Sequence, residues 1–97
     1  MLTSKQRSRL RGLANTLTAV TQVGKAGITP ALVYSLSQSL EAHELIKVSV
    51  LESSGRTAED VLRALAEELS AEPVQAVGAK ITLYRRSSRK DIEHLQI

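Results

Sequence analysis

Apolar side chains recur at intervals of three and four residues in three stretches of the chain, which is the spacing of one buried helix face. We therefore expect helices over residues 4–15, 30–43 and 58–69. Each stretch is preceded by a threonine, a residue type that can cap the free N–H groups of a first helical turn. The first of these, Thr3, has a Gln three residues later, as a capping box requires, and Thr29 is followed by a proline at the first helical position.

Four other stretches are rich in β-branched residues or alternate apolar with polar side chains, as strands with one buried face do. We expect strands at residues 16–23, 45–51, 74–77 and 80–86. Pro73 stops the preceding helix, and Gly78-Ala79 joins the last two strands tightly. The order αβαβαββ predicts an α+β fold in which three helices cover one face of a mixed four-stranded sheet.

Length and composition indicate one domain over residues 1–97, with a polar tail of uncertain order at 87–97. Phe and Trp are absent, so the core must be aliphatic, and Tyr34 and Tyr84 are the only aromatic residues. The sequence contains no cysteine, no apolar stretch long enough to span a membrane and no secretory signal. We therefore expect a cytoplasmic, monomeric protein that is not bound to a membrane.

Charge is arranged in blocks along the chain. Residues 1–40 contain basic but no acidic residues, residues 41–79 are mainly acidic, and residues 80–97 are basic again, for a net charge of +3. Such separation can make one side of a fold strongly positive, which is typical of nucleic-acid binding, although a membrane surface would also accept it. The alternative for the basic first helix is a merely solvated face.

A short motif, Gly24-Lys25-Ala26-Gly27, lies between the first predicted strand and the second predicted helix. A loop in this place can present backbone N–H groups and a helix N-terminus to an anion, and its glycines let a phosphate chain come close. The GXXG loops of KH domains clamp about four nucleotides in this way. The alternative is that the glycines only let the chain turn from strand to helix.

Four segments in order along the chain together resemble the CRM domain, and more narrowly its free-standing bacterial form, the YhbY family of ribosome-associated RNA-binding proteins. They are residues 2–7 with 10–14, then 23–29, 43–48 and 83–85. The resemblance implies a KH-like fold related to the C-terminal domain of translation initiation factor three. It also implies binding to structured RNA and association with precursors of the large ribosomal subunit. It maps the GXXG loop onto Gly24–Gly27 and the basic surface onto Lys5, Arg11, Lys25, Lys47 and Arg85.

We therefore expect a protein that contacts structured ribosomal RNA and assists maturation of the large ribosomal subunit. The loop and the basic blocks should share one side of the fold. Recognition should rely on backbone and shape, since only Tyr84 is placed to stack on a base, and packing at a sheet edge is equally open to it. The expected RNA-contacting residues are Gly24, Lys25, Ala26, Gly27, Lys5, Arg7, Arg9, Arg11, Lys47, Lys80, Tyr84, Arg85 and Arg86.

Two other classes of function fit the sequence less well. An enzyme needs a nucleophile, a base and an orienting group at recognisable spacing, and the chain offers only His43 beside Glu44, and His94 in the tail. Ala26 stands where a nucleotide-binding loop would hold Mg²⁺ with Ser or Thr, which disfavours nucleoside triphosphate hydrolysis. Two histidines without a cysteine also argue against a metal site, and we therefore expect no catalysis, metal or cofactor. The stronger alternative is an interaction module that docks on ribosomal proteins through its acidic third helix. A steep salt dependence of RNA binding would favour phosphate contacts instead.

Overall fold

The elements follow the predicted αβαβαββ order, and the fold class is confirmed. The computed structural model describes residues 2–97. All three predicted threonine caps form, including the capping box between Thr3 and Gln6. A short 3₁₀ helix, η1, was not predicted. The elements are α1 (Ser4–Ala14), β1 (Ala19–Val23), α2 (Pro30–His43), β2 (Leu45–Val50), η1 (Glu52–Ser54), α3 (Ala58–Leu69), β3 (Glu72–Val77) and β4 (Lys80–Tyr84).

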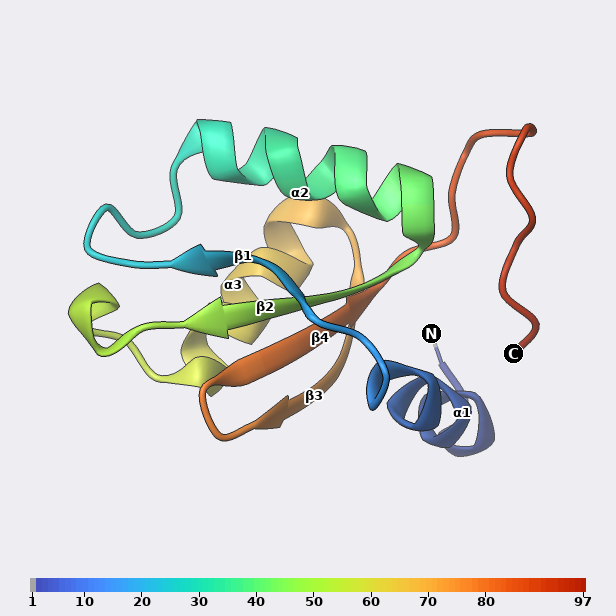
Figure 1. The fold of residues 1–97 in the computed structure, drawn as a ribbon, viewed down its shortest axis with the longest axis horizontal. Helices are drawn as coiled ribbons and strands as arrows, with labels where there is room; N and C mark the ends of the chain where they lie inside the picture. Colours follow the sequence, from blue (N-terminus) through green and yellow to red (C-terminus); the bar gives the residue numbers. More distant parts are fainter. Residues whose placement is uncertain (1) are drawn as a thin grey trace.

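The four strands form one mixed sheet in the order β1-β2-β4-β3, with β1 and β3 at its edges (Figure 1). β1 and β2 run parallel, with α2 as their connection, while β4 is antiparallel to both β2 and β3. Pro73 lies inside β3, so the predicted start of this strand at residue 74 is two residues late. An edge strand tolerates a proline because one of its sides has no partner to pair with.

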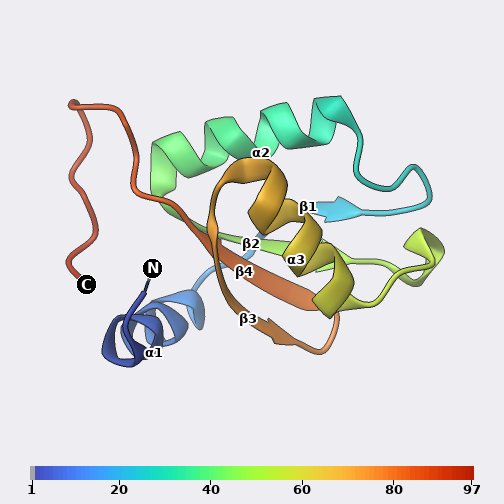
Figure 2. The same ribbon diagram turned by 180° about the vertical axis from the view of Figure 1, so that it is seen from behind.

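Buried side chains form two clusters on opposite faces of the sheet. α2 and α3 cover the face that includes Ile46 and Leu83, whereas α1 packs against the other face near Leu45 and Tyr84 (Figures 1 and 2). The prediction that all three helices cover one face is therefore wrong for α1. The cause is the period-two alternation of strands, which turns Leu45 and Tyr84 away from α2 and gives the apolar stripe of α1 its own partners.

The first and last strands are shorter than predicted. Residues 15–17 extend the end of α1 through turns in which their N–H groups bond to carbonyls three residues earlier, so β1 begins at Ala19 instead of residue 16. β4 ends at Tyr84 instead of Arg86. Beyond it, the Arg85 N–H donates to the carbonyl oxygen of Glu44 at 2.9 Å, and the chain leaves the sheet.

The tail over residues 87–97 contains neither helix nor strand, yet it follows a defined path from the end of β4 back toward α1 (Figure 1). The Ser87 hydroxyl donates to the carbonyl oxygen of Glu41 at 2.6 Å, which holds the start of the tail to α2. Leu95 and Ile97 pack against the cluster beneath α1. The segment of uncertain order is therefore an anchored part of the fold.

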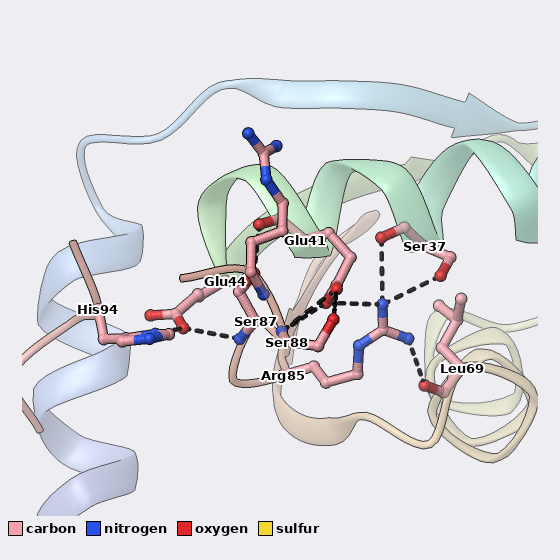
Figure 3. Close-up of polar contacts among 9 residues, drawn as sticks. Ser37, Glu41, Glu44, Leu69, Arg85, Ser87, Ser88 and His94 are labelled. Carbon is pink, nitrogen blue, oxygen red and sulfur yellow. Dashed lines mark hydrogen bonds and ion pairs between the residues drawn. The ribbon is translucent and has the colours of Figure 1, made fainter. Parts of the chain in front are cut away.

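A single buried carboxylate, that of Glu44, fixes both ends of this tail (Figure 3). Its two oxygens accept the N–H of Ser87 and the N–H of Leu95, each at 2.7 Å, and Nδ1 of His94 lies 2.5 Å from Oε2. Burial by itself would raise the pKa of Glu44, but the hydrogen bonds from His94, Leu95 and Ser87 outweigh it and lower the pKa below its ordinary value. The group therefore remains a carboxylate that accepts all three contacts.

Candidate functional site

The Gly24–Gly27 loop forms a tight turn between β1 and α2. The Gly27 N–H donates to the carbonyl oxygen of Gly24 at 2.9 Å, and Lys25 and Ala26 are exposed at the tip. Gly27 has a φ of 72°, in the left-handed region that side chains disfavour. The second glycine of the motif is therefore favoured by the turn itself, as the structural explanation for Gly27 expects.

The loop leads directly into the N-terminus of α2. Thr29 caps the helix by accepting the Leu32 N–H at 3.1 Å, and Pro30 occupies the first helical position. Pro30 has no N–H, and the Val33 N–H donates to the carbonyl oxygen of Thr29 at 3.0 Å, so in the first turn the N–H of Ala31 stays free. This group and the positive end of the helix dipole lie next to the loop. This end of α2 contains no acidic residue in its first turn, so nothing in that turn competes with an anion for these groups.

Two further connections lie at the same end of the sheet as this loop (Figure 1). The Leu51 N–H, just before η1, donates to the carbonyl oxygen of Val23 at 2.9 Å, and the Val50 N–H donates to Ala79 in the β3–β4 turn at 2.6 Å. A side chain at Gly24 would meet Leu51 at 3.5 Å, an ordinary contact distance. The start of the loop therefore lies against Leu51, whereas its tip is exposed to solvent.

Side chains in two rows cross the sheet face that α2 and α3 leave free. In the row nearer to the loop are Val77, Lys80, Ser49 and Gln22. In the next row are Gln75, Thr82, Lys47 and Ala19. Neither row contains an acidic residue, and the Lys80 ammonium donates to the hydroxyl of Ser49 at 3.3 Å. Lys80, which is exposed, and Lys47, which is half-buried, therefore lie on the same sheet face, on the part that α1 does not cover.

The basic residues of α1 lie far from the loop. Lys5, Arg9 and Arg11 are exposed, while Arg7 is half-buried and its Nε has no hydrogen-bond partner within residues 2–97. α1 and the Gly24–Gly27 loop are at opposite ends of the long axis of a molecule 35 × 25 × 23 Å in extent (Figure 1). The expectation that the basic blocks share the side of the loop is therefore wrong for α1. The two rows that contain Lys80 and Lys47 lie between them.

Arg85, predicted to contact RNA, is instead bound within the protein (Figure 3). Its guanidinium donates to the carbonyl oxygen of Leu69 at 2.8 Å and to the carbonyl and hydroxyl oxygens of Ser37 at 3.1 and 3.0 Å. The carboxylate of Glu41 lies 3.4 Å away. Arg85 therefore joins the end of α3 to α2, a long-range contact that its position after a strand did not reveal.

One of the two tyrosines is buried and the other is exposed. Tyr84 is only 7% exposed and packs in the cluster beneath α1, so packing, not stacking on a base, is the alternative that the structure shows. Burial chiefly raises its pKa, and the charge of Glu44 acts in the same direction. Tyr34, which was not proposed as a contact, is 68% exposed on α2. The helical period already separates it from the apolar stripe through Leu36, and this signal was overlooked.

Arg86 is exposed just beyond β4, as expected of a contact residue. His43 is exposed as well, and the carboxylate of Glu44 is bound by His94 instead of by its sequence neighbour. Residues 2–97 contain no cluster of three or more His, Cys, Asp or Glu side chains suited to a metal ion. None of the helices in this part of the chain is long and apolar enough to cross a membrane.

Comparison with known proteins gives a consistent picture over nearly the whole chain. The family model described as the CRS1/YhbY (CRM) domain matches residues 2–85. The protein named "Probable RNA-binding protein YqeI" from Bacillus subtilis is 43% identical over 94 residues, covering 96% of this chain and 98% of the relative. A Haemophilus influenzae "RNA-binding protein" is 35% identical over 92 residues, covering 95% and 93%. The solution structure of a hypothetical Staphylococcus aureus protein matches with a TM-score of 0.74 and 35% identity, covering 98% of this chain and 100% of that one.

Proposed function

The chain belongs to the CRS1/YhbY (CRM) domain family, as the sequence predicted, and from this premise we propose that it is an RNA-binding protein without enzymatic activity. Its ligand is structured ribosomal RNA, held by the Gly24–Gly27 loop and a basic surface, and it assists maturation of the large ribosomal subunit. The names of the Bacillus subtilis and Haemophilus influenzae relatives support RNA as the ligand.

The observation that carries the proposal is the loop itself. It brings exposed Lys25 and the positive N-terminal end of α2 beside each other at one end of the molecule, with no acid in the first helical turn. Phosphate oxygens are the acceptors that such an arrangement suits, because N–H groups, helix dipole and lysine all favour negative charge. A nucleic-acid backbone therefore fits this end better than a neutral ligand.

The separation of the loop from α1 indicates what kind of RNA fits. A local single-stranded contact would use one end only, whereas an RNA helix can extend from the loop across Lys80 and Lys47 to the arginines of α1. Its phosphates recur along a rigid body, so contacts at both ends of the 35 Å axis reinforce each other. This favours recognition of RNA shape by dispersed basic residues over readout of sequence.

The test is the salt dependence of binding to protein-free large-subunit RNA. We expect log affinity to fall linearly with log salt, and Lys25→Ala to weaken binding and reduce the steepness of that slope by about 1. Lys90→Ala, which removes the same charge from the exposed tail, is the matched control and should change the slope less. Binding to whole subunits but not to free RNA, with little salt dependence, would instead favour docking on ribosomal proteins through α3.

A further inference from the structure

A hollow of about 510 Å³ lies between α2 and α3. Its lining includes Ile28 and Thr29, the two residues that directly follow Gly27, so one wall continues the Gly24–Gly27 loop. Figure 2 shows the C-terminal end of α3 against the middle of α2, with the loop beyond the start of α2. The hollow therefore adjoins the loop along the start of α2.

The aromatic wall of the hollow is Tyr34, whose side chain is 68% exposed. An aromatic ring that is exposed to this extent does not gain the free energy that burial of its apolar surface would give. The Tyr34 hydroxyl forms no hydrogen bond with any residue of the described range 2–97. Pro30 and Val33 add apolar side chains to the lining of the hollow. Flat, unstacked bases are the groups that RNA-binding proteins place against such rings.

The polar wall is formed by Glu68 and Ser37. Glu68 is exposed and forms no hydrogen bond or ion pair within residues 2–97, so its carboxylate is available as an acceptor. Ser37 is fixed by Arg85, which bonds to both oxygens of that serine and to Leu69, the residue after Glu68. Arg85 thereby holds the two helices together beneath the hollow, and the spacing between Tyr34 and Glu68 is set by this contact.

We propose that the hollow binds one unpaired RNA base that carries an exocyclic amino group, adenine, cytosine or guanine, stacked on Tyr34 with its amino group donating to Glu68. This rests on the proposed function, since the loop must hold the phosphate of the same strand. The charge of Glu68 decides how the nucleotide enters: a carboxylate repels phosphate but accepts from a base amino group, so the base faces the hollow and the backbone faces Lys25. Uracil, which offers a carbonyl oxygen in place of the amino group, is disfavoured.

The experiment measures binding of the full chain to four fluorescent RNA hairpins by polarisation. One hairpin is fully paired, and the other three carry a single bulged adenosine, cytidine or uridine. We expect the adenosine and cytidine bulges to bind more tightly than the uridine bulge or the paired hairpin. Tyr34→Ala should weaken the adenosine complex by about tenfold while leaving the paired hairpin unchanged, and Tyr34→Phe should retain the affinity because the ring remains.

Glu68→Ala should reduce the preference for adenosine over uridine. Glu59→Ala, an equal loss of charge elsewhere on α3, should leave that preference unchanged. If Tyr34→Ala binds all four hairpins like the wild type while Lys25→Ala weakens them, the base site is refuted and the loop proposal stands. If Lys25→Ala also has no effect, the proposed function fails first. A Tyr34→Ala defect confined to intact ribosomal subunits would assign the hollow to a protein and overturn the base site.

Discussion

Replacement of Glu44 by glutamine tests whether one buried carboxylate holds the C-terminal tail. The substitution keeps the size of the side chain and leaves the positive φ of 66° as it is, so backbone strain is equal in both proteins. It replaces one acceptor oxygen by an NH₂ group. That group then faces donors, the Ser87 N–H among them, and His94 loses its charged partner.

The expected loss follows from the contacts of Oε2. Two hydrogen bonds to a charged acceptor are weakened or broken, each worth about 1.5–3 kcal/mol. The neutral amide is easier to bury than a carboxylate, which offsets part of this loss. We therefore expect the free energy of unfolding to fall by about 2–4 kcal/mol, and for a domain of this size each kcal/mol corresponds to roughly 4–8 °C in Tm.

Urea unfolding followed by far-ultraviolet circular dichroism measures this change. His43→Ala is the control, because His43 adjoins Glu44 in sequence but is exposed, and its replacement should cost less than about 0.5 kcal/mol. Hydrogen exchange should also show faster exchange at the Ser87 and Leu95 amides in Glu44→Gln. If the free energy of unfolding falls by less than about 0.5 kcal/mol and both amides remain protected, Glu44 does not hold the tail. We call its contacts with Ser87, His94 and Leu95 the Glu44 clamp.

The same carboxylate gives a pH dependence of defined sign. The pKa of Glu44 lies below its ordinary value of 4.5 in the folded protein, so its stabilisation is complete above that value and is lost as pH falls through the lower folded pKa. The pKa of Glu41 is lowered chiefly by hydrogen bonds from Ser88, so Glu41 also loses its stabilising effect at low pH. This effect is the same in the wild type and in Glu44→Gln. Wild type should therefore lose stability more steeply than Glu44→Gln as the pH falls below 4.5.

Two further pairs of substitutions test which residues have a structural role. Arg85→Ala should lower the free energy of unfolding by about 2–3 kcal/mol in urea titration, because it removes bonds to Leu69 and Ser37, whereas Arg86→Ala should change it by less than about 0.5 kcal/mol. Equal effects would contradict the bracing role of Arg85. Gly27→Ala should cost about 1 kcal/mol for a side chain at φ 72°, while Gly24→Ala, with room for a Cβ, should cost little; a similar cost at both positions would count against this account.

The order of elements could be predicted because local signals agreed with one another. Threonine caps, a proline at the first turn of α2 and the two hydrophobic periods all act within a few residues. The face on which α1 packs could not be predicted in this way. Its stripe through Leu10 and Ala14 shows that the helix is buried on one side, but the partner surface is formed by β2, β3 and β4, which are distant in sequence.

The candidate site was predictable to the same extent. The position of the Gly24–Gly27 loop between a strand and a helix start is a local feature, and the structure has it there. Whether a basic residue is exposed or bonded within the protein depends on tertiary contacts. Arg85 and Arg86 are neighbours just after β4. Arg85 is nevertheless bound by Ser37 and Leu69, whereas Arg86 is exposed. Charge along the sequence therefore overstates the surface that is free to bind.

The division of the molecule between its two ends follows from these contacts. Positive-φ glycines at residues 27, 55 and 78 lie in the three connections at one end of the sheet. The other end is held by the Glu44 clamp, the packing of Leu95 and the buried face of α1. A rigid end can keep the arginines of α1 at a fixed distance from the loop. Loss of the clamp should therefore weaken RNA helices that span both ends more than it weakens contacts made by the loop alone.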